Sequence, residues 1–247
     1  LAFKRFKKVY SFVQYNYLNW STKVAVKKAA KIIVPSEVTK EDLIELYRCD
    51  PAKIEVVPHG FSEPRVVNED KVMSESEVFQ YFEIKKDSKY VFFVGRLESK
   101  KNLVNLVKAF SEFSKSHPEY KLILAGSRGV GFHKIIAAVK KLKLIDKVIM
   151  PGYITEEEKY VLYKYCAFFA FPSLYEGFGL PVLEAFYHKK AVLCSNCSSL
   201  PEVAGEAAHL IDPASVEEIS AGMKKLIEDE AYKIDLIGKG SERLKNY

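Results

Sequence analysis

Short apolar runs alternate with amphipathic segments along most of the chain. The apolar runs are rich in β-branched and aromatic side chains, and most are apolar throughout, which is typical of strands buried on both faces. Between most of them, apolar side chains recur every three or four residues, as Leu103, Leu106 and Phe110 do, which predicts helices. This alternation predicts a parallel sheet with helices on both faces. The predicted strands are residues 31–35, 53–58, 90–95, 121–126, 147–152, 167–172, 191–195 and 208–212.

One stretch, residues 60–78, interrupts the alternation. It contains Pro64 and the polar run N68-E-D-K71, a composition typical of a connection between units. Only two predicted strands and one clear helix precede it, whereas six strands follow it. We therefore expect an α/β fold in which a doubly wound parallel sheet follows the incomplete end of a second domain. The expected divisions are residues 1–62 for that incomplete domain, 63–80 for a linker, 81–231 for the main domain and 232–247 for a C-terminal helix.

Composition narrows the class of protein. With 48% hydrophobic residues over 247 positions, the chain can bury a substantial core. No apolar run approaches the ~20 residues that a membrane-spanning helix needs, and the first residues do not resemble a signal peptide, so we expect a cytoplasmic protein. Four scattered cysteines are too few for a disulfide framework, and they form no recognisable metal-binding pattern.

The net charge of +6 is concentrated at the start of the sequence. Residues 1–31 hold eight basic and no acidic side chains, whereas the rest of the chain holds 30 basic and 32 acidic ones. Aromatic residues such as Phe6, Tyr10 and Trp20 are interleaved with these cations. Three interpretations follow: a solvated helix whose aromatic residues pack on the protein, contact with anionic lipid, or nucleic-acid binding. We expect peripheral contact of residues 1–31 with the inner face of an anionic membrane, and we expect no nucleic-acid partner.

The segments that follow the predicted strands carry the candidate chemistry, since ligands of parallel sheets bind beyond the carboxyl ends of the strands. The loop G-R-L-E-S-K-K-N holds Arg96 and Lys101, which could neutralise a diphosphate, although solvated loop cations would give the same pattern. The glycines of G126-S-R-G-V-G follow the order G-x-x-G-x-G, and no acidic residue ends the next strand. This is weak support for a nicotinamide-dependent oxidoreductase, because an ordinary tight turn explains it equally well.

A glycine-rich stretch with two carboxylates, S173-L-Y-E-G-F-G-L-P-V-L-E184, follows the strand predicted at 167–172. Gly177 and Gly179 would let the backbone approach a ligand, and Pro181 suits the first turn of a helix that should start near Leu180. We expect Glu176 and Glu184 to point into one space and to bind two hydroxyl-bearing parts of one ligand. Glutamates that only favour a helix dipole would explain the position of Glu184 but not the glycines.

The stretch E176-G-F-G-L-P-V-L-E184 resembles the signature of the retaining glycosyltransferases of family 4, or group 1, which have the GT-B fold. V94-G-R-L-E-S-K-K-N-L, A125-G-S-R-G and S199-L-P-E-V-A-G-E-A-A support the resemblance in the expected order, over roughly residues 30–230. It implies a hexosyltransferase-type enzyme that moves a sugar from a nucleotide diphosphate sugar to a glycan or lipid-linked acceptor, in polysaccharide or glycolipid assembly. This chain would supply its Rossmann-like donor-binding domain.

The resemblance also implies roles for individual residues. Arg96, Lys101 and Glu176 would be catalytic: the two cations would hold the donor diphosphate in place of a metal, since the chain has no D-x-D triplet, and Glu176 would bind sugar hydroxyls. No metal or cofactor is expected beside the UDP-sugar or GDP-sugar donor. The alternative is a module that binds a nucleotide sugar without transferring it. Glu184 would bind the ribose, Gly152 and Tyr153 would face the base, and the other donor-binding residues would be Gly95, Gly126, Gly177, Phe178, Gly179 and Leu180.

Overall fold

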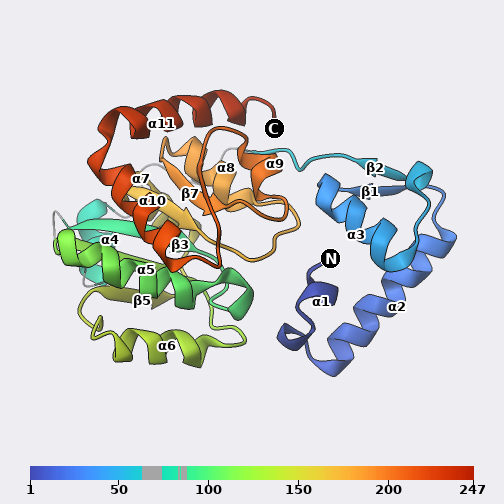
Figure 1. Cartoon of the computed structure of the whole chain (residues 1–247), viewed down its shortest axis with the longest axis horizontal. Coiled ribbons are helices and arrows are strands. Elements are labelled where there is room, and N and C mark those ends of the chain that lie inside the picture. Colours follow the sequence, from blue (N-terminus) through green and yellow to red (C-terminus); the bar gives the residue numbers. More distant parts are fainter. Residues whose placement is uncertain (63–73, 83, 85–87) are drawn as a thin grey trace.

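The larger of two lobes is built on a six-stranded parallel sheet (Figure 1). The computed structural model describes residues 1–62, 74–82, 84 and 88–247. The strand order is β5-β4-β3-β6-β7-β8. Successive strands are therefore added toward one edge of the sheet from β3 to β5 and toward the other edge from β6 to β8. Ligands of such sheets bind where the order switches, here between β3 and β6. The strands are β3 (Lys89–Val94), β4 (Tyr120–Ala125), β5 (Val148–Gly152), β6 (Phe168–Phe171), β7 (Val192–Ser195) and β8 (His209–Ile211).

Helices cover both faces of this sheet, which explains why its central strands are apolar throughout. In β3, the side chains from Tyr90 to Phe93 are all fully buried. Helix α5 packs against α6 and α10, whereas α8 packs against α11 and α4 against α7. The helices of this lobe are α4 (Glu75–Tyr81), the 3₁₀ turn η4 (Ser99–Lys101), α5 (Leu103–Ser116), α6 (Phe132–Lys141), α7 (Glu156–Tyr165), α8 (Leu180–Tyr187), α9 (Leu200–Ala204), α10 (Val216–Glu228) and α11 (Glu230–Leu244).

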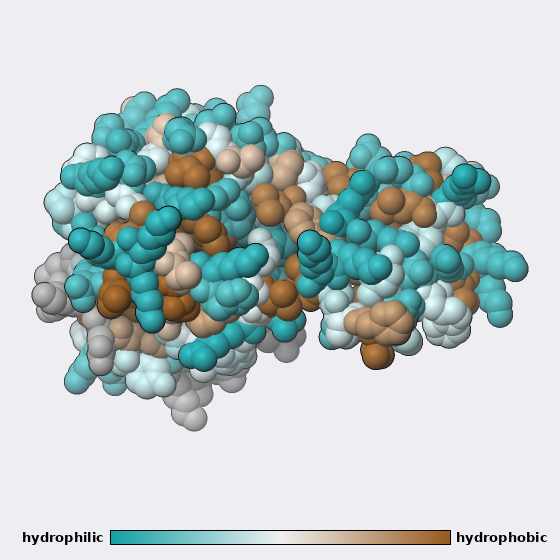
Figure 2. All heavy atoms as spheres, turned by 60° about the horizontal axis from the view of Figure 1, so that its bottom comes forward, coloured by the Kyte–Doolittle hydropathy of each residue, from teal (hydrophilic) through white to brown (hydrophobic). Residues whose placement is uncertain are grey.

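The smaller lobe has a two-stranded parallel sheet and a small core of its own. Val34, Leu43, Cys49 and Ile54 are buried together there. Figure 2 shows apolar surface exposed among hydrophilic side chains on this lobe, and a narrower region that joins it to the larger one. Its elements are α1 (Ala2–Arg5), η1 (Lys7–Val9), α2 (Phe12–Lys28), β1 (Ile32–Val34), α3 (Glu37–Tyr47), η2 (Pro51–Lys53) and β2 (Ile54–Val56).

The chain crosses to the larger lobe directly after β2 and passes the C-terminus (Figure 1). There the amide of Phe61 donates a 2.8 Å hydrogen bond to the carbonyl of Tyr247. Part of the segment expected to be a linker forms α4, whose Val78 and Phe79 are buried in the core of the larger lobe. Residues 63–73 of that expected linker lie outside the described residues.

The sequence-based prediction of the fold is confirmed. Each of the eight predicted strands is present, all pair in parallel, and the six later strands form one sheet. The predicted helix near Leu180 is α8, with Pro181 in its first turn. The expected boundary at residues 231 and 232 falls inside the first turn of α11. None of the described helices is long and apolar enough to cross a bilayer.

Candidate functional site

Three glycines lie side by side where β3, β4 and β5 end. The amide of Gly95 donates to the carbonyl of Ala125 at 3.0 Å, and that of Gly126 donates to Gly152 at 2.6 Å. All three glycines have positive φ angles, 146°, 134° and 86° in chain order. A Cβ atom on Gly126 would lie 1.9 Å from the carbonyl oxygen of Gly95. The strand ends therefore present bare backbone, which is what close approach by a ligand requires.

Lys101 and Glu176 meet beside these strand ends. The Nζ atom of Lys101 lies 2.5 Å from Oε1 of Glu176, and both side chains are nearly buried. The lysine ends the 3₁₀ turn η4 after β3, and its ammonium group also lies 4.7 Å from the centre of the Phe171 ring. The loop that follows β6 is held to this turn, because the amide of Leu174 donates to the carbonyl of Lys100 at 2.8 Å. The structure therefore brings together two predicted site residues that are 75 positions apart.

Arg96 and Lys101 both line a cavity of about 690 Å³ between the lobes. The side chain of Arg96 is 62% exposed, and its Nε atom lies 3.8 Å from Glu98. Lys100 adds a third cation, and residues of the smaller lobe, including Lys8 and Tyr10, complete the wall. Four cations, Lys8 included, line this cavity with one carboxylate, that of Glu98, and such an excess of positive charge favours an anionic ligand. The two cations predicted to bind a diphosphate thus share one cavity.

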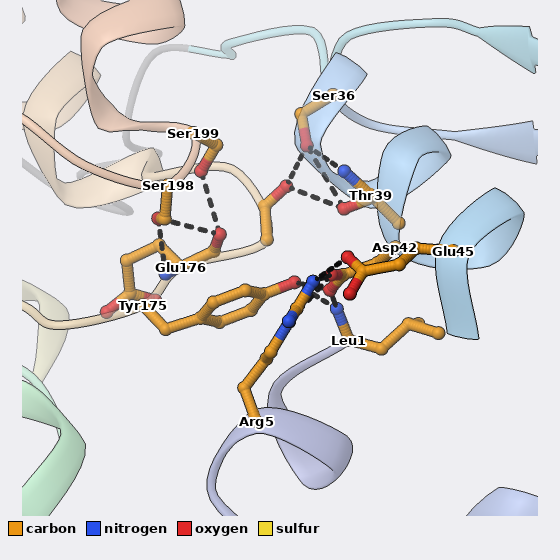
Figure 3. Close-up of polar contacts among 11 residues, drawn as sticks. Leu1, Arg5, Ser36, Thr39, Asp42, Glu45, Tyr175, Glu176, Ser198 and Ser199 are labelled. Atoms are coloured by element: carbon orange, nitrogen blue, oxygen red, sulfur yellow. Dashed lines mark hydrogen bonds and ion pairs between the residues drawn. The ribbon is translucent and has the colours of Figure 1, made fainter.

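The loop that carries Glu176 is fixed from two sides (Figure 3). On one side, the Ser198 hydroxyl accepts from the amide of Glu176 at 2.8 Å, and Ser199 donates to the carbonyl of the same residue at 3.0 Å. On the other side, Ser36 of the smaller lobe donates to the carbonyl of Gly177 at 2.8 Å, and Thr39 lies 3.4 Å from that oxygen. The backbone around Glu176 is therefore ordered by side chains of both lobes.

The buried carboxylate of Asp42 also contacts this loop, through Tyr175. Asp42 on α3 is 2% exposed and accepts from the hydroxyl of Tyr175, the residue before Glu176, at 2.5 Å. Arg5 donates to the same carboxylate at 2.8 Å and also pairs with Glu45. Burial raises the pKa of Tyr175 to about 12, so its hydroxyl remains a donor at neutral pH. This buried carboxylate is thus paired and hydrogen-bonded, as burial requires.

Glu184 has different partners from Glu176. It accepts from Lys159 and from the hydroxyl of Tyr163, both on α7 and both at 3.0 Å. Burial and the neighbouring Glu184 carboxylate hold the pKa of Tyr163 well above its usual value. We expected Glu176 and Glu184 to enter one space, but among the described contacts they share no partner. Glu184 lies in the second turn of α8, and its side chain is directed to α7.

The remaining predicted donor-binding residues differ in exposure. Tyr153 is 80% exposed and Leu180 is 42% exposed. Gly179 has a φ of 128° and begins α8, where a Cβ atom would lie 2.8 Å from Leu200. The ring of Phe178 is buried against His59 and Tyr247, so only its backbone remains for a ligand.

Sequence reasoning missed the residues of the smaller lobe that hold the Glu176 loop. Ser36 is the N-cap of α3, which a serine at that position predicts, but its bond to Gly177 has no sequence signal. Glu202 also accepts from the amide of Glu37, at 3.0 Å, across the lobes.

The fold is that of the GT-B glycosyltransferases, as solved structures show. HepE from Anabaena, determined with UDP and glucose, is 19% identical with a TM-score of 0.77, over 94% of this chain and 62% of that one. A sucrose-phosphate synthase from Thermosynechococcus elongatus is 23% identical with a TM-score of 0.75, over 94% of this chain and 57% of that one. The family model "Glycosyl transferases group 1" matches residues 74–245, and "Glycosyltransferase Family 4" matches residues 2–63. The chain belongs to the group 1 glycosyl transferases.

Curated relatives act in glycan assembly. O-antigen chain mannosyltransferase B of Escherichia coli is 33% identical over 64% of this chain and 42% of its own length. N-acetylgalactosamine-N,N'-diacetylbacillosaminyl-diphospho-undecaprenol 4-alpha-N-acetylgalactosaminyltransferase of Campylobacter jejuni is 27% identical over 89% of this chain and 57% of its own length. The chain thus spans about half the length of these relatives.

Proposed function

We propose that this chain supplies the donor-binding half of a retaining hexosyltransferase, which moves a sugar from a nucleotide diphosphate sugar to a hydroxyl of a glycan or lipid-linked acceptor. The observation that carries the proposal is the contact between the buried ammonium group of Lys101 and the carboxylate of Glu176, beside a cavity that Lys101 shares with Arg96. It places fixed positive charge next to a hydrogen-bond acceptor suited to sugar hydroxyls. The mannosyltransferase and N-acetylgalactosaminyltransferase relatives support the hexosyl class.

The reaction needs stabilisation of its leaving group. The bond between the anomeric carbon and the diphosphate oxygen breaks, and its electron pair stays on the diphosphate. A new bond forms from the acceptor hydroxyl oxygen to the same carbon, and the hydroxyl proton would pass to the departing diphosphate. Lys101 and Arg96 would neutralise the departing diphosphate, which is a form of electrostatic catalysis by positioned cations. These cations would serve where other glycosyltransferases use a metal.

The other site residues are assigned to the rest of the donor. Glu176 would accept from sugar hydroxyls, and Glu184, which Lys159 and Tyr163 hold in place, would accept from the ribose. The bare backbone at Gly95 and Gly126 would allow close approach of the phosphates. Gly177, Phe178, Gly179 and Leu180 would contribute backbone groups, and Gly152 and Tyr153 would face the base. The proposed donors are UDP-sugars or GDP-sugars.

Substitution of Lys101 tests this assignment. In the full-length enzyme, Lys101→Ala should lower the rate of transfer by about 100-fold or more, as loss of a transition-state donor does, while the fold survives. Donor affinity is measured by calorimetry with UDP-sugars and GDP-sugars, and the anomeric configuration of the product by NMR. Lys108→Ala, at an exposed position on α5, is the matched control. Near-normal transfer by Lys101→Ala would refute the assignment, and donor binding without transfer by the unsubstituted enzyme would favour the binding module.

We also propose peripheral contact with an anionic membrane, at the cytoplasmic face. On α2, four apolar side chains are 62–83% exposed, and Lys23, Lys27 and Lys28 follow on the same helix. Aromatic side chains next to cations suit the interface of an anionic bilayer. A lipid-linked acceptor would be presented there. The four exposed residues are Phe12, Val13, Tyr17 and Trp20.

A further inference from the structure

A second cavity adjoins the proposed donor cavity. It has a volume of about 530 Å³ and lies between the first residues of the chain and the start of α6. Lys8, Val9 and Val130 line both cavities, so the two are neighbours. The family comparisons and the donor assignment leave it without a role. Its basic lining residues are Lys4, Arg5, Lys7, Lys8, His133 and Lys134.

The charge of this second cavity is uncompensated. No acidic residue lines it, and of its cations only Arg5 forms an ion pair within the described part of the chain, with Asp42 and Glu45. Lys4 and Lys7 rest against the ring of Tyr15, at 5.6 and 4.6 Å, which leaves their charge in place. By contrast, a cavity at the amino ends of β3 and β4 is lined by two lysines and two glutamates, so its charges balance.

Helix α6 adds to this imbalance. Its N-terminus opens on the second cavity at Gly131, with no side-chain cap and no acidic residue in the first turn. The first turn instead carries His133 and Lys134. The positive charge of Lys134 opposes the helix dipole there, and further lysines line the same cavity. A bound anion would relieve both sources of repulsion, and local conflicts of this kind mark functional positions.

The lining also contains apolar side chains, which indicate the kind of group to which the anion is attached. Phe6, Val9 and Val130 line the second cavity beside the cations, and Val130 is 46% exposed. The exposed aromatic face of α2 begins three residues after Val9, at Phe12. We infer that this cavity binds the phosphate or diphosphate group that links an acceptor glycan to its lipid, with the first part of the hydrocarbon against the apolar residues. The inference rests on the proposed function, since it names the acceptor for the same reaction.

Binding of an isoprenyl diphosphate tests the inference. Farnesyl diphosphate is titrated into this chain by calorimetry with the donor cavity saturated by UDP or GDP, whichever binds. The double variant Lys7→Gln/Lys134→Gln removes two cations that line only the second cavity, and should weaken binding about tenfold or more. The control Lys140→Gln/Lys141→Gln removes the same charge from the far end of α6 and should leave the affinity within about twofold.

Three results would overturn the inference. They are unchanged farnesyl diphosphate affinity in the Lys7/Lys134 variant, an equal loss in the control, and inorganic pyrophosphate binding as tightly as farnesyl diphosphate. In a transfer assay with full-length enzyme, the Lys7/Lys134 variant should raise the KM for a lipid-linked acceptor and preserve kcat. Failure of the donor assignment is distinguishable: the chain would then bind farnesyl diphosphate at the second cavity but bind no nucleotide sugar.

Discussion

The hydroxyl of Ser36 donates a 2.8 Å hydrogen bond to the carbonyl of Gly177, a residue 141 positions later in the chain. Ser36 belongs to the smaller lobe and is fully buried, and Gly177 directly follows Glu176. The same hydroxyl accepts from the amide of Thr39 and so caps α3. One side chain therefore ties the start of a helix in one lobe to the proposed sugar-binding loop in the other.

Loss of this hydroxyl should impair transfer as well as stability. We expect Ser36→Ala to destabilise the chain by about 1–2 kcal/mol, since it removes a helix cap and leaves a buried carbonyl with a weaker donor. We also expect transfer by the full-length enzyme to fall about fivefold, because the Glu176 loop is held less firmly. Ser74→Ala is the matched control, since Ser74 caps α4 and is not among the residues that line the proposed donor cavity. Equal effects of both variants on transfer, at equal stability, would contradict the positioning role.

Neutralising Glu176 should separate diphosphate binding from sugar transfer. Glu176→Gln removes the charge that Lys101 contacts, so Lys101 becomes freer to bind phosphate. We expect affinity for UDP or GDP to be kept or raised, whereas transfer falls at least tenfold. Calorimetry and initial rates provide the two measurements, and Glu112→Gln, at an exposed ion pair on α5, is the control. A parallel loss of nucleotide affinity and transfer would show that Glu176 supports the nucleotide instead.

The contact between two strand ends makes Gly126 sensitive to substitution. A Cβ atom there would lie 1.9 Å from the Gly95 carbonyl oxygen, and the φ angle of 134° is unfavourable for any other residue. We expect Gly126→Ala to lower the free energy of unfolding by roughly 2–4 kcal/mol. Gly238→Ala, in α11 with nothing within 4 Å, should instead raise it by about 0.5–1 kcal/mol. Denaturant unfolding of both variants compares them directly, and equal values would be inconsistent with the strand-end contact.

Exposed aromatic residues of α2 should govern membrane contact. Phe12→Ser/Trp20→Ser removes two side chains that are 83% and 62% exposed, so the fold should tolerate the change. We expect weaker cosedimentation with vesicles that contain phosphatidylserine, because buried apolar area and charge both contribute to interfacial binding. Ile234→Ser, exposed on α11 in the larger lobe, is the control. Vesicle binding equal to that of the unsubstituted chain would remove α2 from the membrane contact.

Much of the fold could be predicted from the sequence, because its signals are local. Aromatic and β-branched runs such as Y90-V-F-F-V94 fill strands that are buried on both faces, and turn residues mark their ends. The segment at 75–81 was harder, because Val78 and Phe79 are apolar within a polar stretch and pack into the core of the larger lobe. Its one local signal is the capping box that Ser74 and Glu77 form at the start of α4. Its assignment to a linker reflected that composition.

The candidate site was only partly predictable. Lys101 and Glu176 could be proposed because each follows a strand, and neighbouring strand ends meet at one edge of a sheet. The partners of Glu184 could not, since the direction of its side chain depends on Lys159 and Tyr163 across a helix interface. Contacts between the lobes, such as those of Asp42 with Tyr175, depend on how two folded units meet, which no short sequence pattern encodes.

The pairing of Lys101 with Glu176 has a consequence for turnover. In this pair the two charges cancel, so any ligand that takes the ammonium group must offer the carboxylate a replacement donor. A sugar still attached to its nucleotide would offer its hydroxyls to Glu176, whereas the spent nucleotide keeps only its ribose hydroxyls, which the proposed function assigns to Glu184. Under the proposed function, Glu176 would compete with the diphosphate for Lys101 once the sugar had departed, and this competition would favour release of the product.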